Sequence, residues 1–287
     1  MDIIGTIIQA IIQGVTEFLP VSSSGHLSLF QHFTGSGGEA GLLLSVYLHL
    51  GTLLAVFIAF RETIWALIKE CGFLIKDIFK GKFKWSEMNG ERRMIFMLIF
   101  STAMLIPFFV FKDFFAGISE DNSILVEGFC FLYTSIILFL SDKFSKGTKG
   151  YRDITVKDSV TVGIFQGVAL LPGVSRSGST ISSGLLCGFT RDTAVRYAFI
   201  LGIPAILGGS VTQAYDAMQS EVSVHAVELI VGFVVAMLVG LAAIKMVSWL
   251  LKSDKFKVFS IYTFILGILV IGVGVYELAT GNVVCIK

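Results

Sequence analysis

The sequence predicts an all-α integral membrane protein in which six transmembrane helices and two re-entrant helical hairpins form two inverted-topology repeats. Three observations lead to this prediction. The 287 residues are 54% hydrophobic and 15% charged, with a mean hydropathy of +0.82, a composition typical of polytopic membrane proteins. One polar motif interrupts an apolar stretch twice. Most of the 22 Lys and Arg residues fall in three loops, which the positive-inside bias assigns to one side of the membrane.

The first copy of the motif, Gln13-Gly-Val-Thr-Glu-Phe-Leu-Pro-Val-Ser-Ser-Ser-Gly-His26, follows an almost wholly apolar stretch over 3–12. Glu17 therefore lies near the end of a hydrophobic helix, where an ionised carboxylate is costly. Pro20 ends this helix, and three serines follow. A helix broken by polar groups is tolerated at membrane depth only inside protein or beside a water-filled cavity. We therefore predict a re-entrant hairpin over 2–34.

The second copy of the motif aligns with the first without a gap. Gln166-Gly-Val matches Gln13-Gly-Val, and Val174-Ser-Arg-Ser-Gly matches Val21-Ser-Ser-Ser-Gly at the same offset, which is about half the chain. The sequence therefore predicts two copies of one structural unit. The copies differ where chemistry would differ, because the first carries a carboxylate and an imidazole and the second carries an arginine.

The other apolar segments complete the two repeats in chain order. We predict a single membrane domain over 1–287, with repeat one over 1–141, including the hairpin 2–34, and repeat two over 158–279, including a hairpin over 160–190. Full spans are predicted over 42–60, 94–111, 124–140, 197–215, 227–250 and 258–278, with an interfacial helix over 64–79. The basic loops then share the cytoplasmic side. Inverted repeats place their site near the midplane, where the two breaks should face each other.

Charge and cysteine content exclude several classes of function. A net charge of +1, without a basic patch interleaved with aromatics, gives no reason to expect a nucleic-acid partner. The cysteines Cys71, Cys130, Cys187 and Cys285 have neither metal-ligand spacing nor a disulfide framework. Because no basic segment precedes Ile3, we expect no cleavable signal peptide.

Polar groups at the first break indicate acid–base or nucleophilic chemistry. Gln13 and Glu17 share one helix face, so Glu17 is expected to hold a divalent cation or to accept a proton. The alternative is a structural carboxylate satisfied by serines and backbone. If the second half-helix begins at Ser23, then Ser23 and His26 are neighbours and form a candidate nucleophile and base. His49 is expected to be a packing residue.

The second break predicts a phosphate cradle. Arg176 is the only Lys or Arg between Lys157 and Arg191, and its guanidinium matches phosphate geometry bidentately. Amides that open the following half-helix also favour an anion. Hydroxyls, and glycines that permit close approach, surround the arginine: Gly173, Ser175, Ser177, Gly178, Ser179 and Thr180. A purely structural ion pair between Arg176 and Glu17 would leave this cluster unexplained, so a lipid phosphate is the expected substrate.

The segments Gln13–His26 and Pro172–Thr180 resemble the two signature motifs of the undecaprenyl-diphosphate phosphatases, the bacitracin-resistance type of bacterial inner-membrane enzyme. The resemblance covers essentially the whole chain. It implies hydrolysis of undecaprenyl diphosphate to undecaprenyl phosphate and inorganic phosphate, which recycles the lipid carrier for cell-wall synthesis. It also implies a divalent cation (Mg²⁺ or Ca²⁺), a homodimer, and an active site open to the outer leaflet of the plasma membrane.

Residue by residue, the resemblance implies that Glu17 and Gln13 form the acidic, metal-binding motif. It implies that Ser23 and His26 are the catalytic serine and histidine, and that Arg176 is the phosphate-binding arginine. The implied substrate-binding neighbours are Ser22, Ser24, Gly173, Ser175, Ser177, Gly178 and Thr180. Because Gln13 is a neutral amide, it binds a cation more weakly than a second carboxylate would.

The residues leave the nucleophile open among Ser23 with His26 as base, His26 itself, and a water that His26 activates. They also leave a second class of function, a secondary transporter or flippase of a polyprenyl phosphate, because inverted repeats with broken helices are the usual transporter architecture. The enzyme is preferred because a carrier needs a phosphate cradle but neither a nucleophile nor a base. A structural membrane scaffold would leave both breaks without a role.

Overall fold

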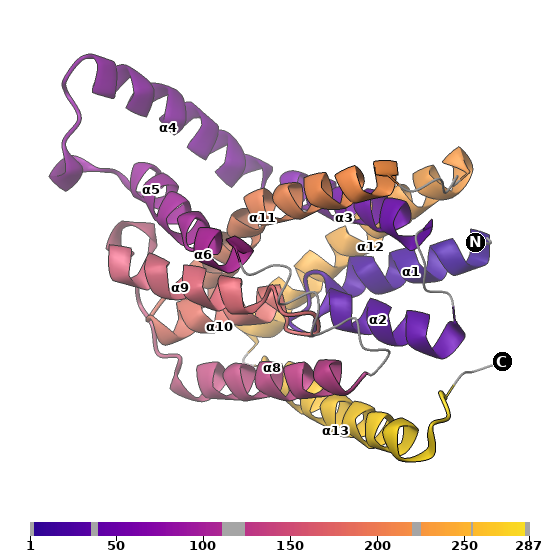
Figure 1. The fold of residues 1–287 in the computed structure, drawn as a ribbon. Coiled ribbons are helices and arrows are strands. Elements are labelled where there is room, and N and C mark those ends of the chain that lie inside the picture. Colours follow the sequence, from indigo (N-terminus) through magenta and orange to yellow (C-terminus); the bar gives the residue numbers. More distant parts are fainter. Residues whose placement is uncertain (1–2, 36–39, 111–123, 220–224, 254, 285–287) are drawn as a thin grey trace.

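A computed structural model describes residues 3–35, 40–110, 124–219, 225–253 and 255–284, and the regular structure in these residues is helical apart from one isolated bridge between Lys149 and Phe189. Most helices pack into one bundle, from which α4 projects (Figure 1). The helices are α1 Ile3–Thr16, α2 Ser23–Thr34, α3 Ala40–Ala59, α4 Arg61–Phe79, η1 Trp85–Glu87, α5 Gly90–Ala103, α6 Leu105–Val110, α8 Leu125–Phe144, η2 Tyr151–Asp153, α9 Val156–Val168, α10 Arg176–Leu186, α11 Arg191–Gln219, α12 Ala226–Lys252 and α13 Lys257–Thr280.

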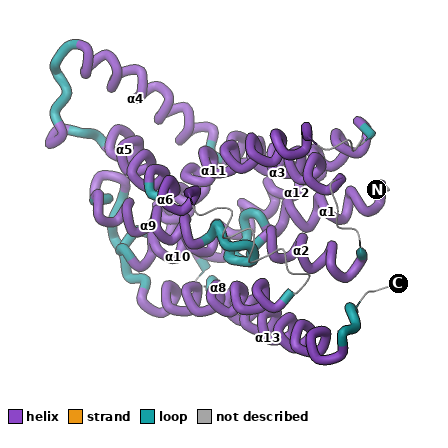
Figure 2. The backbone as a smooth tube through the Cα atoms, viewed as in Figure 1, coloured by secondary structure: helices purple, strands orange, loops and turns teal. Residues whose placement is uncertain are grey.

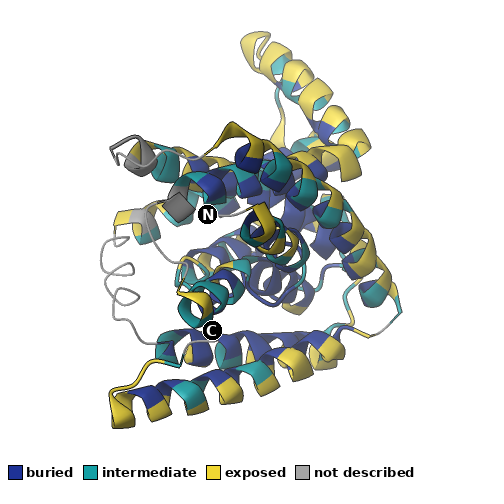
Figure 3. Cartoon of the chain, turned by 90° about the vertical axis from the view of Figure 1, so that its right-hand side faces the viewer, coloured by how far each residue is buried: buried dark blue, intermediate teal, exposed yellow. Residues whose placement is uncertain are grey.

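Several of these helices suit a bilayer. Among the described residues, α8, α11 over 191–215, α12 and α13 are each long and apolar enough to cross a membrane, and α3 with α4, bent by 82° at their junction, can supply a fifth crossing. Exposed residues cover the outward faces of the outer helices, while buried residues line the inside of the bundle (Figure 3). On α13, for example, Phe264 and Leu269 are more than half exposed. The prediction of a helical integral membrane protein is confirmed.

Each predicted hairpin is a pair of short helices separated by a polar break. Helix α1 packs on α2, and α9 packs on α10. The loops at the two breaks lie close together at the centre of the bundle (Figure 2). The Gly173 amide donates to Ser24 Oγ at 3.3 Å, and Ser177 Oγ donates to the Leu19 carbonyl at 3.0 Å. The prediction that the two breaks face each other is therefore confirmed.

Two glycines set how closely the hairpins approach their neighbours. A Cβ on Gly14 would lie 2.9 Å from the Ala236 carbonyl oxygen, so glycine lets α1 lie directly against α12. Gly173 has a φ of +92°, and a Cβ there would lie 2.9 Å from Cys130 Cβ on α8. The second break therefore needs glycine both for its backbone conformation and for its packing.

The span predicted over 94–111 is wrong as a single helix. The structure has α5 ending at Ala103 and a separate α6 beginning at Leu105. Pro107 has no N–H to bond to the Ala103 carbonyl, and its ring would crowd that carbonyl in a continuous helix. The end of this predicted span, beyond Val110, lies outside the described residues. The loop over 112–123 lies outside them as well.

The helix predicted over 64–79 is present as α4, which begins three residues earlier, at Arg61. Arg92 of α5 donates to Glu70 at 2.7 Å and to Asp77 at 2.9 Å and so ties α4 to the bundle. Trp65 and Phe73 on α4 are more than half exposed. An amphipathic helix with this pattern is suited to a membrane surface.

Candidate active site

Glu17 lies in the turn between α1 and α2 and is only 6% exposed. Gln13 Nε2 donates to its Oε2 at 2.9 Å, and Ser23 Oγ donates to the same oxygen at 2.6 Å. The Arg176 guanidinium, from the other hairpin, donates through Nη2 to Oε1. A buried carboxylate is tolerated only when it is paired and hydrogen-bonded. Here both of its oxygens have donors.

The half-helices that follow the two breaks begin with the same cap. Ser22 Oγ at the start of α2 and Ser175 Oγ at the start of α10 each accept the amide three residues on, at 3.2 and 3.0 Å. Ser23 and Arg176 are therefore equivalent first residues of the two half-helices. Both donate to Glu17. The internal duplication thus brings a hydroxyl and a guanidinium to one carboxylate.

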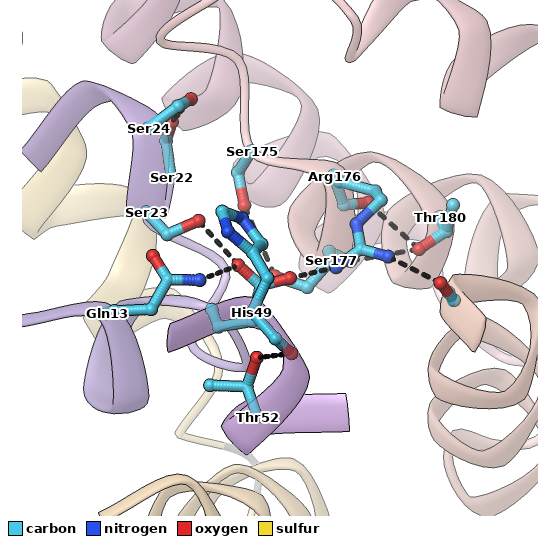
Figure 4. Close-up of polar contacts among 12 residues, drawn as sticks. Gln13, Ser22, Ser23, Ser24, His49, Thr52, Ser175, Arg176, Ser177 and Thr180 are labelled. Carbon is cyan, nitrogen blue, oxygen red and sulfur yellow. Dashed lines mark hydrogen bonds and ion pairs between the residues drawn. The ribbon is translucent and has the colours of Figure 1, made fainter. Parts of the chain in front are cut away.

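A cavity of about 260 Å³ lies between the two breaks. Arg176 Nη1 donates to the Gly202 carbonyl of α11 at 3.0 Å, which holds the guanidinium beside the cavity (Figure 4). The Arg176 side chain is 24% exposed and that of Glu17 is 4% exposed, so a ligand meets the guanidinium before the carboxylate. The wall combines polar groups with apolar ones: Glu17, Ser23, His49, Arg176, Leu170, Leu171 and Ile206. Such a lining suits an amphipathic ligand with an anionic head.

His26 is not placed beside Ser23 in the way that the sequence suggested. Helix α2 does begin at Ser23, but His26 Nδ1 lies 2.7 Å from the Ser22 carbonyl oxygen and Nε2 lies 2.7 Å from the Tyr262 hydroxyl of α13. A carbonyl oxygen only accepts, so in the neutral ring Nδ1 carries the proton and Nε2 accepts from Tyr262. Ser23 donates to Glu17 instead. The expected pairing of Ser23 with His26 is therefore wrong.

His49 lines the cavity, so its interpretation as a packing residue is wrong. Its side chain borders the same cavity as Ser23 and Ser175, and all three side chains are drawn in Figure 4. His49 Nδ1 lies 2.8 Å from the Ser45 carbonyl oxygen, which places the proton of a neutral ring on Nδ1. Nε2 has no hydrogen-bond partner among the described residues. A polar stripe formed by Ser45, His49 and Thr52 on one face of α3 was the available signal.

The other predicted residues mainly shape the breaks. Ser24, Ser175 and Ser177 line the cavity. The Oγ atoms of Ser175 and Ser177 are 3.3 Å apart. Thr180 Oγ1 donates to the Arg176 carbonyl at 2.9 Å, so its hydroxyl is directed to its own helix, and Thr180 does not line this cavity. The ion pair between Arg176 and Glu17, which the sequence raised as an alternative, is present, and the serine hydroxyls line the same cavity.

A divalent cation fits this site when ligands from outside the protein, such as substrate phosphates, complete its coordination. In the described part of the chain, no group of three His, Cys, Asp or Glu side chains converges. Gln13 Oε1 is buried and has no hydrogen-bond partner there, and its amide contacts Glu17. Mg²⁺ is commonly held by one or two carboxylates together with substrate phosphates. Gln13 and Glu17 therefore fit a cation that arrives with a phosphate ligand.

Fold and site together define a helical membrane protein whose two broken helices assemble a carboxylate, a serine and an arginine around a cavity, a set of groups suited to phosphate chemistry. The model of the family described as bacitracin resistance protein BacA matches residues 6–269, and the chain belongs to this family. A relative from Alkaliphilus metalliredigens is 38% identical over 92% of this chain and 96% of its own length. A relative from Halothermothrix orenii is 38% identical over 94% and 98%, and one from Methanobrevibacter smithii is 37% identical over 94% and 97%. All three are named undecaprenyl-diphosphatase.

Proposed function

We propose that this protein hydrolyses undecaprenyl diphosphate to undecaprenyl phosphate and inorganic phosphate, and so recycles a lipid carrier for cell-wall synthesis. One structural observation carries the proposal. Ser23 and Arg176 come from hairpins far apart in the sequence, and both donate hydrogen bonds to the Glu17 carboxylate. A transporter or flippase would need the arginine as a phosphate cradle but not the serine–carboxylate pair. The names of the relatives also favour hydrolysis.

Arg176 binds the terminal phosphate of the substrate. Its Nη2 exchanges the contact with Glu17 for phosphate oxygens, while Nη1 keeps its bond to the Gly202 carbonyl. The amides of the first turn of α10 lie beside the guanidinium and favour the same anion. Charge that develops on the phosphoryl oxygens in the transition state is thereby stabilised. The apolar wall of the cavity accepts the first part of the lipid.

Ser23 is the nucleophile, and Glu17 takes its proton. Ser23 Oγ already donates to Glu17 Oε2 at 2.6 Å. In the first step a bond forms between Oγ and the terminal phosphorus, and the bridging oxygen leaves with its electron pair as undecaprenyl phosphate. This leaving group needs little protonation, because the second pKa of a phosphate monoester is about 6.

His49 supports the second step, in which water hydrolyses the phosphoserine. Nε2 takes a proton from the attacking water, and the new phosphorus–oxygen bond forms as the bond to Ser23 Oγ breaks. The Oγ regains its proton from Glu17, inorganic phosphate leaves, and His49 releases the proton from Nε2 to water. Nε2 suits this role because the bond from Nδ1 to the Ser45 carbonyl leaves it as the accepting nitrogen of a neutral ring. A divalent cation (Mg²⁺ or Ca²⁺), held by Glu17, Gln13 and the substrate, would neutralise charge on the diphosphate.

The proposed membrane arrangement has six spans and two inverted repeats, in a bacterial plasma membrane, with the site open to the outer leaflet. Helix α1 packs on α12 and α9 packs on α5, while α8 packs on α13 and α3 packs on α11. When the repeats are exchanged, the first two pairs exchange with each other and the last two map onto themselves. This pattern supports a two-fold relation between the halves. A homodimer is part of the same proposal.

The nucleophile is tested by trapping the phosphoenzyme. The full chain in detergent is mixed with substrate labelled in the terminal phosphate and quenched within milliseconds. Protein-bound label is expected from the wild type, and Ser23→Ala is expected to abolish both label and turnover. Ser253→Ala, which changes a serine outside both breaks, is the control. Turnover without Ser23, or label that persists in Ser23→Ala, would exclude the serine.

A further inference from the structure

A second cavity, of about 810 Å³, lies where α3 bends into α4. It shares no lining residue with the cavity between the breaks. Its walls come from the end of α3, the first turn of α4, Arg196 of α11 and the C-terminal part of α12. The 82° bend between α3 and α4 keeps this space open. The groove is therefore a separate feature of the molecule, and the proposed hydrolysis makes no use of it.

The charged groups that line this groove are strongly biased to one sign. Four cations face one carboxylate: Arg61, Arg196, Lys245, Lys252 and Glu62. Arg196 donates to Asp192 at 2.8 Å and to Thr63 at 3.1 Å. Within the described residues, the other three cations have no ion-pair partner. Cations gathered in one groove repel one another, so an anion bound between them relieves an unfavourable arrangement.

The groove also has an apolar floor and an apolar edge. Phe60 and Ile244 form the floor and are 8% and 3% exposed. Ile58 and Trp249 lie at the edge and are 40% and 57% exposed. Tryptophan beside lysine is typical of the membrane–water interface. A soluble phosphate would use the cations but would leave this edge uncovered, whereas a phospholipid would use both.

We propose that this groove binds the headgroup of an anionic phospholipid. The phosphate lies among Arg61, Lys245 and Lys252, and the glycerol with the first acyl carbons lies against Ile58 and Trp249. Basic pockets between transmembrane helices recognise acidic headgroups in this way. The bound lipid contacts both α3 and α4 and stabilises the angle between them. Because no residue of the catalytic site takes part, binding is independent of the hydrolytic reaction.

Native mass spectrometry of the full chain tests this proposal. The protein is titrated with phosphatidylglycerol, with phosphatidylcholine of the same acyl chains, and with inorganic phosphate. The wild type is expected to prefer phosphatidylglycerol. Lys245→Gln/Lys252→Gln is expected to weaken that binding about 10- to 30-fold. The matched control Lys80→Gln/Lys82→Gln removes two exposed cations between α4 and α5 and is expected to bind as the wild type does.

Three results would overturn the proposal: equal binding of the two lipids, equal loss in the groove variant and the control, or occupation by inorganic phosphate that phosphatidylglycerol cannot displace. Phosphate release from undecaprenyl diphosphate is measured on the same samples. We expect the groove variant to keep wild-type turnover in detergent, which also shows that it is folded. An inactive wild type that still selects phosphatidylglycerol would contradict the proposed hydrolysis and leave the lipid site standing.

Discussion

At the residue scale, the Glu17–Arg176 pair is asymmetric. The carboxylate is buried with donors on both oxygens, whereas the guanidinium borders the cavity and is held from behind by the Gly202 carbonyl. An ion pair that served stability alone would gain nothing from leaving its cation accessible. This arrangement is what a phosphate-binding arginine requires before its ligand arrives.

Replacing Arg176 should therefore affect catalysis far more than folding. Arg176→Ala is expected to lower kcat/KM about 100- to 1000-fold, because one charged donor to the transition state is lost. Arg176→Lys keeps the charge but cannot bind phosphate in a bidentate way, so an intermediate loss of kcat/KM is expected. Steady-state phosphate release gives the rates, and circular dichroism with gel filtration checks the fold. Near-normal turnover in Arg176→Ala would contradict the phosphate-cradle interpretation.

His49 gives a second prediction at this scale. His49→Gln keeps a hydrogen bond to the Ser45 carbonyl but has no ring nitrogen that could take a proton from water. We expect the phosphoenzyme to accumulate after a rapid quench, because the step that hydrolyses it loses its base. The matched control is His225→Gln, an exposed histidine at the start of α12. If the phosphoenzyme fails to accumulate in His49→Gln and accumulates in His26→Gln instead, His26 is the base.

The sequence predicted part of this residue-level arrangement. Glu17 and Arg176 could be brought together because the duplicated motif requires the two breaks to meet. The direction of a side chain from its helix is set by rotamer and tertiary contacts, so the bond between His26 and Tyr262 could not be seen in the motif. His49 was missed because it lies in a largely apolar span, where the stripe of Ser45, His49 and Thr52 was a weak signal, and only the fold shows that this stripe borders the cavity.

At the element scale, the second break depends on glycine at position 173. A Cβ there would meet Cys130 Cβ at 2.9 Å and Glu127 Cα at 3.0 Å, and the φ is +92°. We expect Gly173→Ala to destabilise the protein by about 2 kcal/mol and to lower turnover, because the backbone that leads into Arg176 must shift.

The control for this prediction is Gly281→Ala. Gly281 also has a positive φ, of +69°, but a Cβ there would meet no described atom within 4 Å. It should cost about 1 kcal/mol and leave turnover unchanged. Thermal unfolding in detergent and phosphate release distinguish the two variants. Equal effects would show that backbone conformation alone, and not packing against α8, makes glycine necessary at the second break.

Hydrogen bonds from Lys149 and Thr155 to the Asp158 carboxylate stabilise the start of α9, and their contribution depends on pH. Asp158 accepts both Lys149 Nζ, at 2.9 and 3.0 Å, and the Thr155 amide, at 2.8 Å. Burial opposes ionisation of Asp158, but the hydrogen bonds from Lys149 and Thr155 outweigh it, so the pKa of Asp158 lies below its ordinary value of 3.8. Its contribution to stability is therefore present above pH 3.8 and is lost as the pH falls through the lowered pKa.

Asp158→Asn is accordingly expected to lower the unfolding temperature at pH 7, by an amount that corresponds to about 2 kcal/mol. The difference between variant and wild type should shrink as the pH falls below about 4. Thermal unfolding followed by circular dichroism over this range measures it. A difference in unfolding temperature that stayed constant with pH would show that ionisation of Asp158 does not stabilise the protein.

At the scale of the whole molecule, the duplication and the apolar segments predicted the helices well, because burial in lipid leaves few alternatives to a helix. Ranges for α3, α8, α12 and α13 differ from the predictions by only a few residues at most ends. The exceptions are the span predicted over 197–215, which lies within the longer α11, and the span divided into α5 and α6, where Pro107 interrupts the hydrogen-bond ladder. Composition reports how apolar a segment is but does not locate such a break.

The most direct test of the whole account is phosphate release from undecaprenyl diphosphate by the purified full chain. The assay is run with Mg²⁺, with Ca²⁺ and with chelator, beside Glu17→Ala, Ser23→Ala and Arg176→Ala. We predict cation-dependent release that each of the three substitutions reduces at least about 100-fold. A folded wild-type protein that binds the substrate without releasing phosphate would contradict it, and transport across liposomes would then become the function to measure.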